Sequence, residues 1–485
     1  MENEGIRSLI RPVRWPVLGR YLGQLALVLG LLTLPPFGVA LWFGDYAVAW
    51  RYLAVVVALA VAAGLLVRLQ APDRLQDNEA MAIVSLAFVL APLLMTFPLV
   101  AAGLSWIDAW FEAVSGITTT GLSTLADVAG QSRSLLFTRA WLQWYGGLGI
   151  AVLAVVLLAQ HGQAARKLAE SSGTEAQAST TRAHGRRVLT VYLLLSLLGL
   201  ALIRAAGLAP FDALLHAMAA ISTGGFSSFN ASLAAPMPAL AAFAVVFTAL
   251  LGAVSLPLYF FAYRRGAREL LLDLELRALL LACLVLTLLL AGWFYRHGMA
   301  PAEAVRDAAL LAVSAQTTAG FSPIVLAGLD AFPKGLLILA MATGGSVAST
   351  AGGIKLLRLL IFLRLVHLAL RRTAVPAHAV LEPRLAGHRL ESEAIVHALL
   401  LIGLFVLVVL LSWLVFLVYG YPPLDALFEV VSAVGTVGLS TGITGPDLPA
   451  VLKWLLCLDM LAGRLEIVAL LVTLYPATWF GNKGG

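Results

Sequence analysis

The chain has 485 residues, of which 61% are hydrophobic and only 12% are charged. Soluble globular domains carry about a quarter charged residues, so this composition excludes an ordinary soluble protein and indicates a membrane protein. Two cysteines, Cys283 and Cys457, both lie within apolar stretches, which argues against a disulfide framework and a thiolate metal site.

Ten apolar stretches are candidates for membrane spans, each of which needs about 20 residues. They cover residues 22–43, 52–67, 80–103, 139–160, 188–205, 237–262, 275–294, 335–370, 395–419 and 450–475. The first stretch follows a basic, proline-containing segment and is long enough to remain as a span, so no cleavable signal peptide is expected.

Lysine and arginine residues are concentrated in alternate connecting segments. Most of the 32 basic residues lie before the first apolar stretch, between the second and third, and in segments 166–187, 264–277 and 355–389. Because cytoplasmic loops carry an excess of Lys and Arg, these segments and both chain termini are predicted to be cytoplasmic. The net charge of +6 therefore orients the protein in a lipid bilayer, and no nucleic-acid partner is expected.

A short motif, Thr-x-Gly-(Leu/Phe)-Ser, occurs four times, each time between two apolar stretches on the predicted outer side. The copies begin at Thr119, Thr223, Thr318 and Thr436. Thirteen residues before each central glycine stands an aspartate, at positions Asp108, Asp212, Asp307 and Asp425. One copy alone would be interpreted as an extracellular turn, but four copies with one spacing indicate an internal repeat.

The apolar segment between each aspartate and its threonine is about three helical turns long, which is too short to cross a bilayer. It is therefore predicted to be a re-entrant helix. Its negative C-terminal end would point toward the Thr-x-Gly loop and favour a cation there. The aspartate at its start is expected to accept free backbone N–H groups.

The four loops have the composition that a K+ selectivity filter needs. Backbone carbonyls replace the hydration shell of K+ where the chain turns several of them toward one axis, and glycine permits the positive φ angles that this requires. Segment 436–440, Thr-Val-Gly-Leu-Ser, closely resembles the potassium-channel loop Thr-Val-Gly-Tyr-Gly. The predicted K+ ligands are Thr119, Thr120, Gly121, Thr223, Gly224, Gly225, Thr318, Ala319, Gly320, Thr436, Val437 and Gly438.

A segment rich in glycine and small hydroxyl residues interrupts the apolar stretch 335–370. Residues 342–353 read Ala-Thr-Gly-Gly-Ser-Val-Ala-Ser-Thr-Ala-Gly-Gly, a composition that destabilises helix. It predicts a flexible break below the filter that acts as a gate, while close packing of small residues between spans is the alternative. The predicted gate residues are Gly344, Gly345, Ser346, Gly352, Gly353, Lys355 and Arg464.

Arg464 lies inside the last apolar stretch. A charge at the bilayer centre costs at least about 2.5 kcal/mol on insertion scales, and such residues usually face a pore or a bundle interior. Arg464 is therefore predicted to project into the pore beneath the filter and to donate hydrogen bonds to carbonyls of the gate segment. The alternative is an ion pair with Glu466 or Asp459 that joins helices.

These repeats resemble the Trk/Ktr/HKT superfamily of potassium transporters, and most of all the membrane subunit of bacterial Trk-type uptake systems. The resemblance extends from about residue 80 to the end, and the first two apolar stretches resemble the extra N-terminal hairpin of that subunit. Segments 141–150, 344–355 and 463–467 are similar to inner-helix segments of its first, third and fourth repeats.

The resemblance implies an all-α polytopic membrane protein with four units around one pore. Each unit would contain a span, a re-entrant helix, a filter loop and a second span, with the inner helix of the third unit broken. The implied divisions are a two-span hairpin at 1–75 and repeats at 76–165, 166–268, 269–375 and 376–485.

The resemblance also implies function and partners. It predicts K+ uptake across the cytoplasmic (inner) membrane, with K+ as the transported ion and no bound cofactor. Plant relatives with serine at the first filter glycine prefer Na+, whereas position 121 is glycine, so K+ is favoured and Rb+ is expected to pass. A homodimer and a separate cytosolic nucleotide-binding regulatory ring are implied, since this chain has no dinucleotide fingerprint.

A secondary transporter that couples a cation to H+ or Na+ is the alternative function. Asp459 and Glu466 are its candidate carboxylates, although the four repeat aspartates lie at the predicted outer mouth. An enzyme is not expected, because the sequence contains no phosphate loop, metal motif or nucleophile constellation. The sequence leaves open whether transport is passive or H+ symport.

Overall fold

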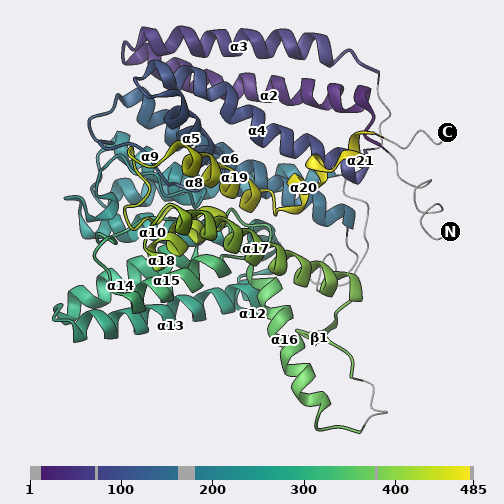
Figure 1. Ribbon diagram of the computed structural model, residues 1–485, viewed down its shortest axis with the longest axis vertical. Helices are drawn as coiled ribbons and strands as arrows, with labels where there is room; N and C mark the ends of the chain where they lie inside the picture. The colour runs from purple at the N-terminus through teal and green to yellow at the C-terminus, as the bar shows by residue number, and fades with distance from the viewer. Residues whose placement is uncertain (1–11, 71–74, 162–180, 377–380, 481–485) are drawn as a thin grey trace.

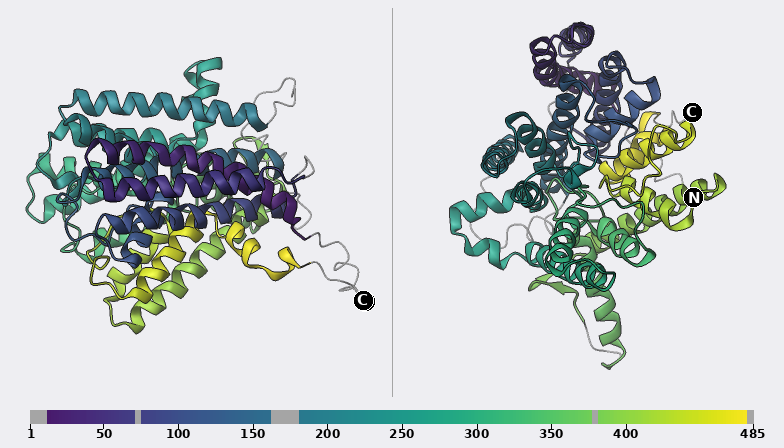
Figure 2. Two further views of the ribbon diagram at one scale, coloured as in Figure 1. Left: turned by 90° about the horizontal axis from the view of Figure 1, so that it is seen from above. Right: turned by 90° about the vertical axis from the view of Figure 1, so that its left-hand side faces the viewer.

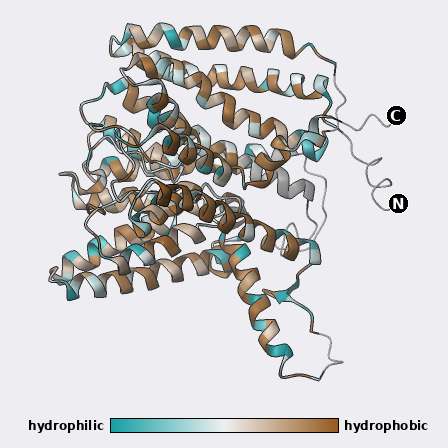
Figure 3. Cartoon of the chain, viewed as in Figure 1, coloured by the Kyte–Doolittle hydropathy of each residue, from teal (hydrophilic) through white to brown (hydrophobic). Residues whose placement is uncertain are grey.

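The computed structural model describes residues 12–70, 75–161, 181–376 and 381–480. Most helices run side by side (Figure 1), with apolar residues along their length and polar residues concentrated toward their ends (Figure 3). Within these ranges, six single helices are long and apolar enough to cross a membrane, and one bent pair makes a possible seventh. The protein is therefore an all-α, multi-pass membrane protein.

Two antiparallel helices form a hairpin at the top of Figure 1. They are α2 (Trp15–Trp42) and α3 (Tyr46–Leu66). Buried polar contacts attach the hairpin to the next part of the chain, because the Tyr52 hydroxyl lies 2.7 Å from Thr138 Oγ1 and the Trp141 indole N–H donates to the Leu32 carbonyl at 2.7 Å. The predicted N-terminal hairpin is thus present.

The remaining chain repeats one order of elements four times: a long helix, a short helix, an extended Thr-x-Gly loop and a further helix. The first unit contains α4 (Asp77–Ala101), α5 (Trp106–Ile117) and α6 (Arg133–His161). The second contains α8 (Thr181–Ala205), α9 (Pro210–Ile221), η1 (Ser232–Ala234), α10 (Ala239–Ala253), α11 (Leu256–Arg265) and α12 (Arg268–Leu272).

The third unit contains α13 (Leu274–Arg296), α14 (Pro301–Gln316), α15 (Ala331–Thr343) and α16 (Leu356–Arg372). Strands β1 (Arg384–Leu385) and β2 (His388–Arg389) pair antiparallel after it. The fourth contains α17 (Ser392–Val418), α18 (Pro423–Val434), α19 (Ala450–Arg464), α20 (Val468–Leu474) and α21 (Pro476–Trp479). The division predicted near residue 165 lies outside the described residues.

The four short helices α5, α9, α14 and α18 begin where the sequence provides a start signal. The Ser105 side chain caps α5 by accepting the Asp108 N–H at 3.3 Å. The other three carry proline in their first two positions, where its fixed φ suits a helix and its missing N–H has no helical partner to lose. Each short helix is followed directly by its Thr-x-Gly loop.

Three of the four inner helices are broken, although the sequence predicted a break only in the third unit. Helices α10 and α11 meet at 85°, α15 and α16 are separated by the 344–355 loop, and α19 gives way to α20 at Glu466 and Ile467, both of which have positive φ. The predicted stretches 237–262, 335–370 and 450–475 therefore each contain two helices. Within the described residues, α6 alone among the four continues without interruption, up to His161.

The two ends of the described chain meet at one end of the bundle. The Val13 N–H donates to the Thr478 carbonyl at 2.8 Å, and the Trp15 and Trp479 rings lie 5.4 Å apart. Helix α16 projects away from the bundle near this end (Figure 1). Seen along the bundle, the units follow one another around the molecule, from blue through teal and green to yellow (Figure 2, right).

Candidate functional site

Each short helix ends in the same hydrogen-bond pattern. The threonine N–H donates to the carbonyl three residues earlier, and the next N–H donates to the carbonyl five residues earlier, as in Thr119 to Gly116 and Thr120 to Ser115, both at 2.9 Å. The same two bonds recur in the other three units. This pair of bonds is a Schellman motif, which satisfies helix-terminal carbonyls.

The threonine of each loop occupies the position where such a motif usually has glycine. The φ angles are 54° at Thr119, 52° at Thr223, 56° at Thr318 and 49° at Thr436. Positive φ is a genuine outlier for a β-branched residue, and strain of this kind costs about 1–3 kcal/mol and clusters at functional sites. Glycine would relieve the strain but has no hydroxyl, so the hydroxyl is what the threonine adds here.

The central glycines join the four loops into a closed ring. A Cβ on Gly121, Gly225, Gly320 or Gly438 would stand 2.2, 2.4, 2.0 or 2.1 Å from a backbone carbonyl oxygen. Those oxygens belong, in the same order, to Gly224, Ala319, Val437 and Thr120. Each loop therefore contacts the next, and the fourth contacts the first, so the loops surround one axis.

Glycines of the inner helices let those helices pack against the ends of the short helices. In three units a Cβ on the inner-helix glycine would clash with the last carbonyl oxygen of the short helix. The distances would be 2.1 Å from Gly146 to Ile117, 2.2 Å from Gly252 to Ile221 and 1.9 Å from Gly463 to Val434. These contacts fix the positions of the C-terminal ends of α5, α9 and α18 against their inner helices. Their negative C-terminal ends meet at the ring, which favours a cation there.

The repeat aspartates do not cap their own helices, so that expectation was wrong. Asp108 and Asp425 instead form ion pairs with Lys453 (2.7 Å) and Lys334 (2.6 Å) of the preceding unit in the ring. Asp212 accepts a hydrogen bond from the Ser228 hydroxyl. Asp307 lies in the second turn, because α14 begins early, at Pro301.

The segments that follow the first two loops are also joined. The Asn230 amide donates to the Asp127 carboxylate at 2.9 Å, and its oxygen accepts the Val128 N–H at 2.6 Å. The hydrogen bond from Asn230 lowers the pKa of the Asp127 carboxyl below its usual range. These contacts connect the first unit to the second outside the ring.

The 344–355 loop lies on the threonine side of the ring. The Gly352 N–H donates to Thr318 Oγ1 at 2.8 Å, and a Cβ on Gly352 would stand 2.1 Å from Thr436 Oγ1. Among the described residues, the Thr119 and Thr436 hydroxyls are buried without a hydrogen-bond partner. The predicted gate segment thus contacts the threonine end of the predicted filter.

Hydrogen bonds with four other helices, α9, α10, α13 and α14, hold this loop. Thr350 Oγ1 donates to the Ile221 carbonyl at 2.9 Å, and the Thr350 N–H donates to the Gly252 carbonyl at 3.1 Å. The Gln316 amide donates to the Gly344 carbonyl at 2.9 Å. Glu275, in the first turn of α13, accepts the Val347 N–H at 2.7 Å.

Arg464 is 3% exposed and reaches the same loop. Its guanidinium donates to the Thr350 carbonyl at 2.8 Å and to the Gly146 carbonyl at 3.4 Å. The ion pairs considered as alternatives are not formed, because Glu466 pairs with Arg358 at 2.5 Å and Asp459 accepts from the Ser412 hydroxyl at 2.7 Å.

The other predicted gate residues lie within this loop or at its end. Gly344 and Gly353 both have positive φ. A Cβ on Gly344 would clash with the Gly352 carbonyl oxygen, and a Cβ on Gly353 would clash with the Gly344 backbone. Gly345 packs against Ala253, and the Ser346 N–H donates to the Ala253 carbonyl at 3.0 Å. Lys355 donates from its ammonium to the Ala351 carbonyl.

A set of polar side chains that was not predicted from the sequence is buried behind the loops. Nine residues before each central glycine stand Glu112, His216, Leu311 and Glu429. Glu112, His216 and Glu429 are each 0% exposed and bond to the serine of their own loop, at 2.6, 3.1 and 2.7 Å. The sequence did contain a signal for this set, because three of the four otherwise apolar segments carry Glu or His at the same repeat position.

The chain matches proteins of one kind over nearly its whole length. Residues 51–478 match the model of the family TrkH, described as cation transport protein. The chain is 31% identical to the Trk system potassium uptake protein TrkH of Halomonas elongata and 30% identical to that of Escherichia coli K12, in each case over 95% of this chain and 98% of the relative. An uncharacterized cation transporter of Methanocaldococcus jannaschii is 28% identical over 94% of this chain and 95% of its own length.

A solved structure agrees with these relatives. The crystal structure of the potassium transporter TrkH from Vibrio parahaemolyticus superimposes with a TM-score of 0.86 at 27% identity, covering 96% of this chain and 100% of that one. The family model alone matches far more than half of the chain. The chain therefore belongs to the TrkH family of cation transport proteins.

Proposed function

We propose that this protein takes up K+ across the bacterial inner membrane through the ring of four Thr-x-Gly loops. The closed ring of contacts from Gly121 to Gly224 and on around to Thr120 carries this proposal. Four loops around one axis supply the several carbonyls that a dehydrated K+ needs. The names of the relatives from H. elongata and E. coli, which are potassium uptake proteins, support the choice of ion.

The ligands in this proposal come from the first three residues of each loop. They are Thr119, Thr120, Gly121, Thr223, Gly224, Gly225, Thr318, Ala319, Gly320, Thr436, Val437 and Gly438. The strained threonines put a hydroxyl at the inner end of the loop. Glycine at 121, rather than the serine of Na+-preferring plant relatives, supports selectivity for K+ over Na+, with Rb+ as a permeant substitute.

The 344–355 loop is the gate in this proposal. Its contacts with Thr318 and Thr436 put backbone at the level where K+ would leave the filter. Arg464 would hold the loop in that position through the Thr350 carbonyl and would repel a cation beneath the filter. Opening then requires the loop to break these bonds and move aside.

The orientation and partners are further parts of the proposal. Both chain ends are cytoplasmic, which is supported by the meeting of Val13 and Thr478 at one end of the bundle and by the positive-inside rule. A homodimer and a separate cytosolic nucleotide-binding ring rest on the family resemblance. The five divisions of the chain given above are retained as the proposed units.

Coupling of the cation to H+ is the second candidate, and Asp459 is the observation that favours it. This carboxylate is 2% exposed in α19, one oxygen accepts from Ser412, and the other has no partner among the described residues. Buried acids in spans often belong to proton relays. H+ coupling is the weaker proposal, because the hydrogen bond that Asp459 accepts comes from Ser412 and not from the loops.

Flux through purified protein tests both candidates. Liposomes that contain the protein should take up Rb+ down its gradient, and excess K+ outside should suppress Rb+ uptake far more than the same concentration of Na+. Passive transport predicts that an imposed pH gradient leaves the initial rate unchanged, whereas H+ coupling predicts that it accelerates uptake. No Rb+ uptake above that of empty liposomes, in either condition, would contradict the proposed function.

A further inference from the structure

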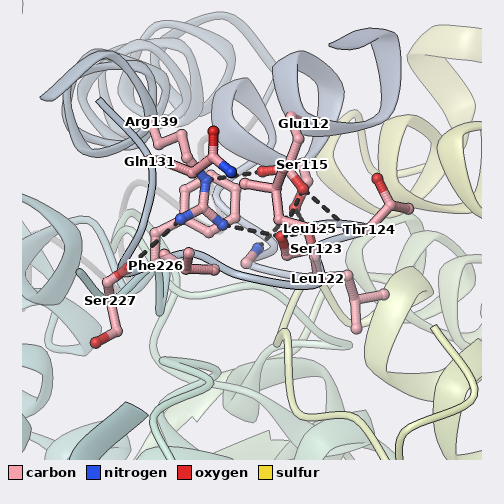
Figure 4. A network of polar contacts seen from close by, with 12 residues as sticks. Glu112, Ser115, Leu122, Ser123, Thr124, Leu125, Gln131, Arg139, Phe226 and Ser227 are labelled. Atoms are coloured by element: carbon pink, nitrogen blue, oxygen red, sulfur yellow. Dashed lines mark hydrogen bonds and ion pairs between the residues drawn. The ribbon is translucent and has the colours of Figure 1, made fainter. Parts of the chain in front are cut away.

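A buried ion pair lies behind the first two loops. The Arg139 guanidinium of α6 donates to the Glu112 carboxylate of α5 at 2.8 Å, and the two side chains are 3% and 0% exposed (Figure 4). Glu112 also accepts the Ser123 hydroxyl at 2.6 Å and the Thr124 N–H at 2.9 Å. The carboxylate therefore holds the first loop directly.

Arg139 extends the same network to the second loop. Its remaining nitrogens donate to Ser123 Oγ at 3.1 Å and to the Ser227 carbonyl at 3.4 Å, and its guanidinium carbon lies 3.8 Å from the centre of the Phe226 ring (Figure 4). A guanidinium supplies five donors in a rigid plane and also stacks on aromatic faces. One side chain thus joins the loops of two different units.

Gln143 stands one helical turn further along α6 and contacts the second loop closer to its central glycine. Its amide nitrogen donates to the Gly224 carbonyl at 2.5 Å, and its oxygen accepts the Phe226 N–H at 3.1 Å. The Gly224 carbonyl is the same oxygen that lies against Gly121 in the ring. Side chains four residues apart share a helix face, so Arg139 and Gln143 act on the same segment.

This arrangement is absent from the matching positions of two other units. The glycines that pack on the short-helix ends, Gly146, Gly252 and Gly463, align the inner helices. Seven and three residues before them stand Arg139 and Gln143 in the first unit, Val245 and Ala249 in the second, and Leu456 and Met460 in the fourth. The repeated fold therefore does not require the polar pair, since apolar residues fill its place elsewhere.

We propose that Glu112, Arg139 and Gln143 are positioning residues that set the ion selectivity of the pathway by fixing the second loop, from Gly224 to Ser227, against the first. The inference rests on the proposed function. A loop held from behind at Gly224 and Phe226 cannot shift its carbonyls inward around a smaller, more strongly hydrated cation. The α6 helix, and not only the loop sequence, thereby contributes to the choice between K+ and Na+.

Three variants separate this role from simple support of the fold. Gln143→Leu removes both amide contacts without changing charge. Glu112→Gln combined with Arg139→Met removes the ion pair without leaving one buried charge unpaired, which single replacements would do at high cost. Arg139→Lys keeps a cation beside Glu112 but lacks the planar fork that also reaches Ser227 and Phe226. Lys453→Met, which breaks the ion pair with Asp108 on the outer side, is the matched control.

The measurement is the ratio of Rb+ to Na+ uptake per folded molecule in liposomes, with the melting temperature recorded for each variant. A net hydrogen bond contributes about 0.5–1.5 kcal/mol, so Gln143→Leu and the double variant should each lower the ratio about three- to tenfold. Arg139→Lys should also lower it, whereas Lys453→Met should lower only the melting temperature.

Two failures are distinguishable. If wild-type protein takes up Rb+ selectively and the variants lose thermal stability while their ratio stays within about twofold of wild type, the positioning role is wrong. If wild-type protein takes up no Rb+, the proposed function itself fails. Should the double variant not fold, Gln143→Leu decides alone, because it moves no charge.

Discussion

Replacing Gly121 by serine should sharply reduce the preference of the protein for K+ over Na+. Gly121 has φ +93°, and a Cβ there would stand 2.2 Å from the Gly224 carbonyl oxygen, a distance that real Cβ atoms do not adopt. The second loop must therefore shift, and the ring loses the spacing that suits K+. The ratio of Rb+ to Na+ uptake should fall by roughly tenfold or more, which corresponds to a loss of about 1.4 kcal/mol or more.

Gly103 provides a matched control for this substitution. It also has positive φ, at +98°, and lies in the first unit, but a Cβ there meets nothing within 4 Å. Gly103→Ser therefore carries similar backbone strain without a clash between loops. The uptake ratio of Gly103→Ser should match wild type. An unchanged ratio in Gly121→Ser would show that this loop is not part of the filter.

Replacing Arg464 by alanine should increase Rb+ flux through folded protein. The substitution removes the hydrogen bonds to the Thr350 and Gly146 carbonyls and a buried positive charge. A hydrogen bond from a charged group contributes about 1.5–3 kcal/mol. If closure of the 344–355 loop limits transport, the initial rate should therefore rise roughly tenfold or more.

The control for Arg464→Ala must destabilise the same helix without touching the loop. Ser412→Ala does so, because it removes the buried hydrogen bond to Asp459 of α19. It should lower the melting temperature and leave the flux per folded molecule unchanged. Reduced or unchanged flux in Arg464→Ala, together with a marked loss of stability, would mean that Arg464 only joins helices.

The motif spacing was sufficient to predict the order of elements in the fold. The constant spacing between each aspartate and its Thr-x-Gly loop predicted a short helix before each loop. The glycines of 342–353 predicted a break in the third inner helix. The break at Glu466 and Ile467 could not be predicted, because a β-branched residue such as Ile467 gives no sign of its positive φ. The break at Ser255 had a signal that was missed, since Pro257 lies in the first turn of α11 and proline marks helix starts.

The contacts between units could not be predicted from the sequence, for a different reason. The ring depends on Gly121 meeting a carbonyl of Gly224, about a hundred residues away in the chain, and no local pattern specifies such a pair. Arg139 stands at the start of the predicted span 139–160, and its buried partner Glu112 comes from the preceding short helix. The ligand and gate residues themselves remain predictions about function, which the geometry supports.

The most direct test is to locate the ion. Diffraction from crystals grown in Rb+ in place of K+, recorded at the rubidium absorption edge, reports the position of each bound Rb+ from its anomalous signal. The proposal predicts peaks on the axis of the ring, within coordination distance of carbonyl oxygens from all four loops, between the Thr119, Thr223, Thr318 and Thr436 level and the four central glycines. Well-diffracting crystals with no peak on that axis, or with Rb+ bound only elsewhere, would contradict it.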